Sequence, residues 1–174
     1  KNGSTKSTTD SRKKLRESSV SLVQEQRDKI IDQAEKLILE KGEIVTLPLK
    51  HRFTEGMYIR EIFMPEGTVL TSRIHKTNHP FSIQKGKCNV YDGDDLQVLE
   101  APHLGITEKN TRRLIHVMED TIWVTFHVTD KTDLAEIEKD LLVERENPIA
   151  DPEKFEKFHN EVKKDNEFLN KEIG

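Results

Sequence analysis

The chain has 174 residues, of which 33 % are hydrophobic and 34 % charged, and its formal net charge is −4. Because soluble domains are typically closer to half apolar, the apolar residues must be concentrated in part of the chain. No run of about 18 apolar residues occurs, which argues against a membrane association through a spanning helix. The chain opens KNGSTKSTTD without an apolar segment, so we expect no secretory signal and a cytoplasmic protein. The single cysteine, Cys88, excludes an internal disulfide and a cysteine-based zinc site.

The first segment, residues 1–20, is rich in Ser, Thr and Lys, and residues 1–16 carry six basic residues and one acidic residue. This composition predicts a flexible basic arm. One interpretation is a merely solvated end; the other is an arm that contacts an acidic partner, either nucleic acid or another subunit. Because the charge of the arm is the only feature that favours nucleic acid, we expect protein partners instead.

Residues 21–43 are predicted to form an amphipathic helix. Apolar residues recur there at helical spacing, at Val23, Ile30, Ala34, Leu37 and Ile38. Ser21 and Gln24 fit a capping box at its start, and Gly42 fits the stop signal after its last turn. A lone helix of this length is marginally stable, so its apolar stripe should pack on the domain or on a partner.

Residues 44–130 read as a β domain. About nine short runs rich in Val, Ile, Thr, Phe and Tyr alternate with turn residues, among them Lys85–Gly86, Asp92–Gly93 and Glu119–Asp120. So many short strands without an intervening helical period predict a closed barrel of the jelly-roll kind. In the last run, residues 122–128, we expect the face of Ile122 and Val124 to be the core face.

Residues 131–174 are predicted to form an acidic helical extension, since residues 133–174 carry thirteen acidic and seven basic residues. Leu134, Ile137 and Leu141 have helical spacing, and Asp151–Pro152 reads as the start of a further helix. The apolar ridge of that last helix is formed by Phe155, Phe158, Val162 and Leu169. The predicted fold is therefore mainly β, a barrel with an N-terminal helix and C-terminal helices.

The stretch Gly67–Gly86 resembles the first cupin motif, G-x5-H-x-H-x3-E-x6-G, in its spacing. His75 stands at the second histidine of the motif, whereas Arg73 replaces the first histidine and His79 replaces the glutamate. The second motif, P-x-G-x2-H, falls on residues 108–113, with Asn110 in place of glycine and Arg113 in place of histidine. Asn tolerates the left-handed backbone that glycine adopts in such a turn.

The region from about 46 to 129 also resembles small cupin-like proteins encoded by bacteriophages and prophages, which have no assigned activity. The resemblance implies a cupin-like jelly-roll barrel in which Arg73, His75, His79 and Arg113 point into one ligand pocket. It implies little about function, because a fold hosts many activities. Should the chain be encoded by a phage, its location would be the host cytoplasm or the virion.

Three interpretations of that pocket remain open. In the first, the site is degenerate and its polar residues form hydrogen bonds with one another. In the second, Arg73 and Arg113 hold a carboxylate or phosphate. In the third, a shifted metal site uses His75 and His79. In the third case the further ligand is His103, His116 or His127, and strand parity counts against His116. Two guanidinium groups disfavour a divalent cation, so the sequence predicts no resident metal and no other cofactor.

The function predicted from the sequence is that of a non-enzymatic, cupin-like protein that works through contacts with other chains, as a homo-oligomer or as a phage virion or assembly component. The predicted contact residues are Val23, Ile30, Phe155, Phe158, Val162 and Leu169. The alternative is a protein that binds a small anionic molecule, or a metal-dependent cupin enzyme, that uses the barrel pocket. In an enzyme without a metal, His75 or His79 would act as the base.

Overall fold

The computed structural model describes residues 6–43, 45, 47–93 and 95–144. Two helices and seven strands are present in this part of the chain: α1 (Lys6–Lys41), β1 (Leu49–Thr54), β2 (Met57–Met64), β3 (Val69–Thr71), β4 (His79–Tyr91), β5 (Leu96–Glu100), β6 (His103–Thr107), β7 (Leu114–Val128) and α2 (Leu134–Leu141). Neither described helix is long and apolar enough to cross a membrane.

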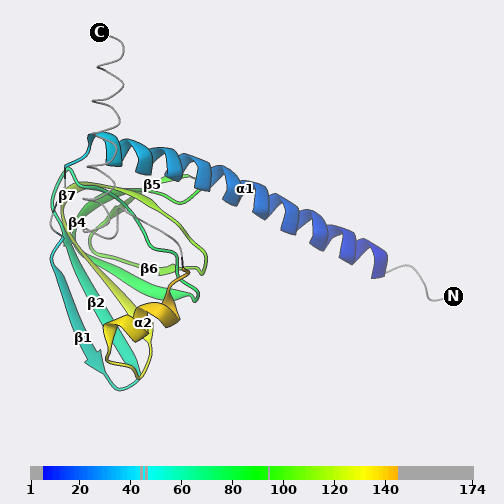
Figure 1. Cartoon of the computed structure of the whole chain (residues 1–174). Helices are drawn as coiled ribbons and strands as arrows, with labels where there is room; N and C mark the ends of the chain where they lie inside the picture. Colours follow the sequence, from blue (N-terminus) through cyan, green and yellow to red (C-terminus); the bar gives the residue numbers. More distant parts are fainter. Residues whose placement is uncertain (1–5, 44, 46, 94, 145–174) are drawn as a thin grey trace, which may run out of the picture.

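The strands form one antiparallel sheet that curls on itself (Figure 1). Its order is β1-β2-β7-β4-β5, while β3 adds to β7 and β6 adds to β4. The inner face encloses a buried cluster that includes Met64, Phe81, Ile83, Val117 and Trp123. The mainly β, barrel-type fold predicted from the sequence is confirmed.

Two of the predicted turns lie inside continuous strands. The runs on either side of Lys85–Gly86 belong to β4, and those on either side of Glu119–Asp120 belong to β7. The pairing of β4 with β7 shifts register between Ile83 and Cys88, so the turn residues mark bulges rather than hairpins. Gly86 has φ 86°, and a Cβ atom there would collide with the backbone oxygen of Asp120. Bulges bend a strand without ending it, and the sheet closes as a result.

The predicted core face of β7 is wrong in part. Trp123 and His127 point to the interior and are buried, although Val124, on the other face, is buried as well. Val128 of that second face is 85 % exposed. The sequence misled because both faces of β7 carry large apolar residues, so alternation alone does not identify the inner one. The first strand also begins later than predicted. The first predicted run is IVTLPL, residues 44–49, whereas β1 begins at Leu49.

The N-terminal helix is longer than predicted. It begins at Lys6 rather than near residue 21, so the segment read as a flexible arm is helical from residue 6 onward. No Gly or Pro interrupts residues 4–41, and the Lys, Arg and Glu side chains between them favour a helix, which explains the extension. The end is as predicted: α1 stops at Lys41, and the Gly42 N–H bonds to Ile38 O at 2.7 Å. The N-terminal half of α1 projects away from the barrel (Figure 1).

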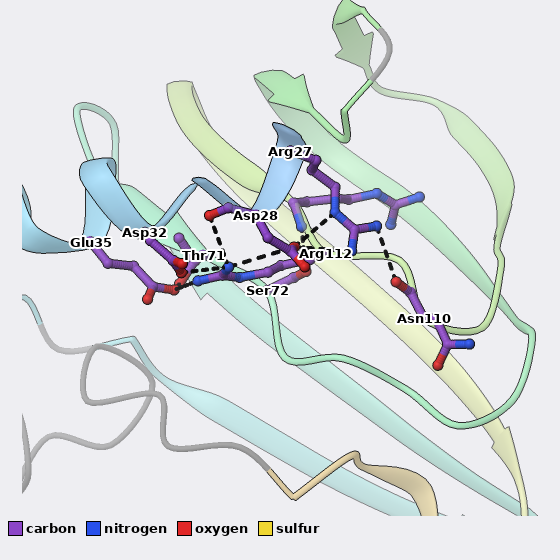
Figure 2. Close-up of polar contacts among 9 residues, drawn as sticks. Arg27, Asp28, Asp32, Glu35, Thr71, Ser72, Asn110 and Arg112 are labelled. Carbon is purple, nitrogen blue, oxygen red and sulfur yellow. Dashed lines mark hydrogen bonds and ion pairs between the residues drawn. The ribbon is translucent and has the colours of Figure 1, made fainter. Parts of the chain in front are cut away.

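A buried arginine attaches α1 to the barrel. Arg112 is 1 % exposed, and its guanidinium lies 2.8 Å from Asp32 Oδ1, 2.8 Å from Glu35 Oε1 and 3.6 Å from Asp28 Oδ1 (Figure 2). The Thr71 hydroxyl also donates to Glu35, at 2.9 Å. Three carboxylates on successive turns of one helix face therefore converge on a single cation, which fixes the rotation of α1 against the barrel.

Further contacts hold the same face of α1. Arg27 is buried and donates to the carbonyl oxygen of Asn110 at 3.1 Å. Ile31 is fully buried, whereas Val23 and Ile30, two predicted partner-contact residues, are 39 % and 46 % exposed. Asn110 itself has φ 63°, as predicted from its place in the second motif.

The helix predicted after the barrel is confirmed as α2. The carboxylate of Asp133 accepts from the Glu136 N–H and caps its start, and Ile137 is buried. The remaining predicted contact residues lie outside the described residues: Phe155, Phe158, Val162 and Leu169.

We predict that Arg112→Leu will detach α1 from the barrel. The substitution removes the cation that Asp32 and Glu35 share, whereas Asp28 keeps its ion pair with Arg27. Breaking a buried ion pair commonly costs 3–5 kcal/mol. Because two of the carboxylates are partly exposed, we expect a loss of about 2 kcal/mol in the free energy of unfolding. Urea denaturation measures this loss, and limited proteolysis should cut α1 sooner. The control is Lys36→Ala, which removes an exposed ion pair of the same helix; an equal effect of both substitutions would contradict the role of Arg112.

Candidate functional site

A cavity of about 420 Å³ lies inside the barrel. Its wall is largely apolar, with Ile62, Met64, Leu70, Ile115, Trp123 and Ile137 among the lining residues. The predicted pocket residues Arg73, His75, His79 and Arg113 all line this cavity. The spacing of the cupin motif therefore brought together four residues that are up to 40 positions apart in the sequence.

Three histidines meet in the cavity. His75, His79 and His127 each offer a ring nitrogen, and these nitrogens lie within 4.8 Å of one another. The ring centroids are 4.2 Å apart for His75 and His79, 4.6 Å for His79 and His127, and 5.2 Å for His75 and His127. His127, which the sequence offered as one of three candidates, is thus the third member of the cluster.

The three histidines come from separate parts of the fold. His79 opens β4, and His127 lies near the end of β7, opposite Tyr58 of β2. His75 lies between β3 and β4, where it forms an isolated bridge with Leu142, just after α2. The flanking backbone bonds from Lys76 N to Leu141 O, at 2.8 Å, and from Val143 N to Ile74 O, at 2.9 Å, hold this segment in place. The cluster therefore needs both β strands and the chain that follows α2.

The histidines are neutral at physiological pH. Burial lowers the pKa of His75 to about 3, and the neighbouring histidines and Arg60 add to the shift. Burial also lowers the pKa of His127 to about 4, with contributions from His79 and Arg60. The pKa of His79 falls below its ordinary value for the same main reason, with Arg113 adding to the shift. Neutral imidazole is the form that binds a metal ion.

Hydrogen bonds and ring contacts orient His127. Its Nε2 lies 3.0 Å from the Thr125 hydroxyl, and its ring stacks on Tyr58 with centroids 5.8 Å apart. The Tyr58 hydroxyl in turn lies 2.7 Å from His51 Nδ1. His127 Nδ1 is buried without a hydrogen-bond partner among the described residues. A buried, unpartnered polar nitrogen is unusual in a native structure and indicates an atom reserved for a ligand.

The two predicted arginines occupy different depths. Arg73 lies at the mouth, with 44 % of its side chain exposed, and forms a 2.8 Å ion pair with Glu138 of α2. Arg113 lies deeper, donates to the Thr107 hydroxyl at 2.8 Å, and places its guanidinium carbon 5.1 Å from the centre of the Phe81 ring. The geometry therefore leaves Arg113, and not Arg73, available to a ligand inside the cavity.

One charged residue of the cavity was missed by the sequence reasoning. Arg60 lies on the inner face of β2, between Tyr58 and Ile62 and opposite Thr125 of β7. In the run MYIREIFM each face carries one charged residue, Arg60 on one and Glu61 on the other. Parity alone could not tell which of them faces inward. The opposite face is equally apolar, with Met57, Ile59 and Phe63, so the run itself contains no signal that singles out Arg60.

The other candidate histidines stand apart from the cluster. His116 is exposed, as its strand parity predicted. His103 packs against Phe81, with ring centroids 5.5 Å apart, and lines a second hollow between α1 and the barrel. Among the described residues, only His75, His79 and His127 form a cluster of potential metal ligands.

Solved structures similar to this chain are cupins. A double-stranded β-helix cupin from Methanocaldococcus jannaschii is 16 % identical, with a TM-score of 0.41, over 52 % of this chain and 86 % of that chain. A cupin superfamily protein from Desulfitobacterium hafniense is 10 % identical, with a TM-score of 0.43, over 55 % of this chain and 87 % of that chain. These similarities concern the barrel fold alone. The phage type inferred from the sequence stays a prediction.

The similar structures include enzymes. An acetylacetone dioxygenase from Acinetobacter johnsonii is 15 % identical, with a TM-score of 0.41, over 47 % of this chain and 59 % of that chain. Similarity at this level concerns the fold of about half the chain and carries no argument about function. No family model and no curated protein matches the sequence.

We predict that the metal-free protein loses stability as the pH falls from 6.5 to 4, in part through His127. An unfolded histidine binds a proton near pH 6.5, whereas folded His127 does so only near pH 4. Acid therefore favours the unfolded chain, by about 1 kcal/mol per pH unit for each such histidine. Urea denaturation at several pH values between 7 and 5 measures the free energy of unfolding. Its decrease per pH unit should be smaller for His127→Gln than for the parent protein. Identical slopes for the variant and the parent would contradict the neutral, buried state of His127.

Proposed function

We propose that this protein is a metal-dependent, small-molecule cupin, in which His75, His79 and His127 hold a divalent transition metal. The observation that supports this proposal most directly is the convergence of three neutral imidazoles inside a mostly apolar cavity. It replaces the absence of metal predicted from the sequence and takes up the open alternative of a shifted metal site, with His127 as the third ligand beside His75 and His79.

The donor set suits such an ion. Imidazole binds zinc, copper, iron and nickel well, and His127 Nδ1 is a buried nitrogen that lacks a hydrogen-bond partner among the described residues. Three protein ligands leave further coordination positions open, as is usual in catalytic rather than structural sites. When bound, the metal would supply Lewis-acid chemistry, by polarising an oxygen of the substrate.

The chain itself supplies the surroundings of the reaction. Trp123, Ile62 and Met64 keep bulk water from the inner part of the cavity and strengthen electrostatic interactions there. Tyr58 and Thr125 orient His127 through ring stacking and a hydrogen bond. Such outer contacts hold a ligand in the rotamer that binding needs, and their loss commonly costs 10–100-fold in metal affinity.

We predict that protein purified without an affinity tag and stripped with EDTA binds one equivalent of Co²⁺. His127→Ala should weaken this binding at least about 100-fold, because losing a ligand costs no less than losing an outer contact. Titration calorimetry and the visible absorption of Co²⁺ measure the affinity and the ligand environment. Because the imidazoles are already neutral, titrations in buffers of different ionisation enthalpy should show little proton release.

The matched control for this experiment is His116→Ala, which removes an exposed histidine of the same strand, β7. It should leave the Co²⁺ affinity unchanged. Failure of the parent protein to bind a stoichiometric amount, or equal weakening by His116→Ala and His127→Ala, would overturn the proposal.

A second candidate function, contact with other protein chains, rests on α1. Val20, Leu22 and Val23 are 55 %, 60 % and 39 % exposed, and Val20 and Val23 also line the hollow between α1 and the barrel. Ile30 continues the stripe one heptad after Val23 and is 46 % exposed. Such a row of apolar residues at helical spacing suits a partner helix. A role in a phage virion or in its assembly stays a prediction.

We predict that deleting residues 1–20, or introducing Val23→Lys, lowers the mass of the assembly in solution. Each change removes or charges part of the exposed apolar stripe, which should disfavour its burial against another chain. Light scattering at several protein concentrations measures the mass. The control is Ser21→Lys, which charges an exposed position nearly opposite Val23 on α1. An unchanged mass in both variants would count against contacts through this helix.

A further inference from the structure

The charges that line the cavity do not balance. Arg60, Arg73 and Arg113 contribute three positive charges, and Glu138 is the one carboxylate among the described lining residues. Glu138 is engaged at the mouth by Arg73. Asp92, which lies outside this lining, attracts Arg113, and Glu138 attracts Arg60, but neither carboxylate forms an ion pair with these arginines among the described residues. Since the three histidines are neutral, the lining keeps a net positive charge.

Neither inner arginine is fully paired within the described part of the chain. Arg60 forms no hydrogen bond or ion pair there, and Arg113 Nε is buried without a hydrogen-bond partner. Arg113 uses one nitrogen for the Thr107 hydroxyl and rests on the Phe81 ring. A charged group removed from water normally requires a partner of opposite charge. Two such groups on one cavity indicate a missing anion.

The arginines also flank the histidine cluster. Arg60 acts electrostatically on His75 and His127, and Arg113 acts on His79. Arg60, Arg113 and the three histidines also line the same cavity. An anion bound by these guanidinium groups would therefore share that cavity with a metal held by the imidazoles.

We propose that the cavity binds a small organic carboxylate through Arg60 and Arg113, and that this carboxylate and the metal bind cooperatively. The inference rests on the proposed function, because it names the substrate class of the same site. The planar guanidinium groups of arginine match a carboxylate in both charge and geometry.

The apolar wall specifies the rest of the ligand. Trp123 is 6 % exposed and stacks on Phe81 with centroids 4.7 Å apart, and Ile62 and Met64 continue the same surface. A fully polar anion would leave this surface unmatched. A cavity of about 420 Å³ lies at the small end of the range for organic ligands. The ligand is therefore a compact acid with an apolar body.

The cooperativity follows from electrostatics. A divalent ion bound to neutral imidazoles keeps its full charge and adds it to the excess already present. In a low-dielectric cavity this repulsion is large, and an anion that lies between the cations relieves it. If the carboxylate strengthens metal binding, the metal must strengthen carboxylate binding by the same factor.

The test uses the full chain and two probes of equal shape, benzoate and the uncharged benzamide. Calorimetry measures each probe with and without Co²⁺, and it measures Co²⁺ with and without benzoate, in buffer of low chloride content. We expect benzoate to bind and to raise the Co²⁺ affinity about tenfold or more, whereas benzamide should do neither. Co²⁺ should raise the benzoate affinity by the same factor by which benzoate raises the Co²⁺ affinity.

Arg60→Met keeps an unbranched apolar stem and removes the guanidinium group with its charge. It should weaken benzoate binding about tenfold or more and, in the absence of benzoate, strengthen Co²⁺ binding, because one repelling charge is gone. A merely structural role of Arg60 would not raise the metal affinity. The matched control is Arg52→Met. Arg52 lies on β1, outside the cavity lining, and is paired with Glu61 of β2. The control should change neither affinity.

The outcomes separate the two proposals. Benzoate binding that depends on Arg60 in a protein that binds no Co²⁺ would overturn the proposed metal function and the cooperativity, and it would leave the carboxylate site standing. Co²⁺ binding without any preference of benzoate over benzamide would overturn the carboxylate site alone. Should Arg60→Met fail to fold, as judged by circular dichroism, the comparison of the two probes on the parent protein decides the matter.

Discussion

The pairing of β4 with β7 is the constraint on which the rest of this structure depends. These two long strands contribute His79 and His127 to the cavity, and Phe81 and Trp123 to the core below it. Their pairing runs through a bulged stretch where Gly86 approaches the backbone of β7 so closely that no side chain would fit. Because the strands bend there and continue, one sheet both closes the barrel and brings the distant histidines together.

The cavity shows how burial can prepare a set of residues for binding. Removing three imidazoles from water keeps them unprotonated, which retains their lone pairs for a ligand. Removing two guanidinium groups from water does not discharge them, because their pKa values are too high. The same apolar surroundings thus create neutral donors and persistent cations side by side. A metal cation bound by the imidazoles and an anion bound by the arginines would together use the free lone pairs and offset the positive charge.

The architecture followed from the sequence more readily than the site did. Alternation and turn residues sufficed for a mainly β fold, and the motif spacing placed Arg73, His75, His79 and Arg113 on one cavity. His127 was one of three open candidates, and Arg60 was not predicted; both lie on strands where both faces carry large apolar side chains. Which face points inward depends on register across the sheet, a long-range property that a local pattern does not contain. The start of α1 was missed for the opposite reason, since nothing in residues 6–20 opposes a helix.

The neighbouring residues Arg112 and Arg113 face opposite sides of the chain. Arg112 is gripped by the acidic face of α1, and Arg113 reaches into the cavity. Arg27 of α1 holds the same loop at the carbonyl oxygen of Asn110. Helix α1, outside the barrel, therefore stabilises the loop that places the charge of Arg113 inside the cavity. A chain trimmed of α1 would keep its histidines in place, since none of them lies on this loop, yet it would lose the outer support of its deepest motif arginine. Substitutions on the surface of α1 can in this way alter ligand selection without touching the cavity wall.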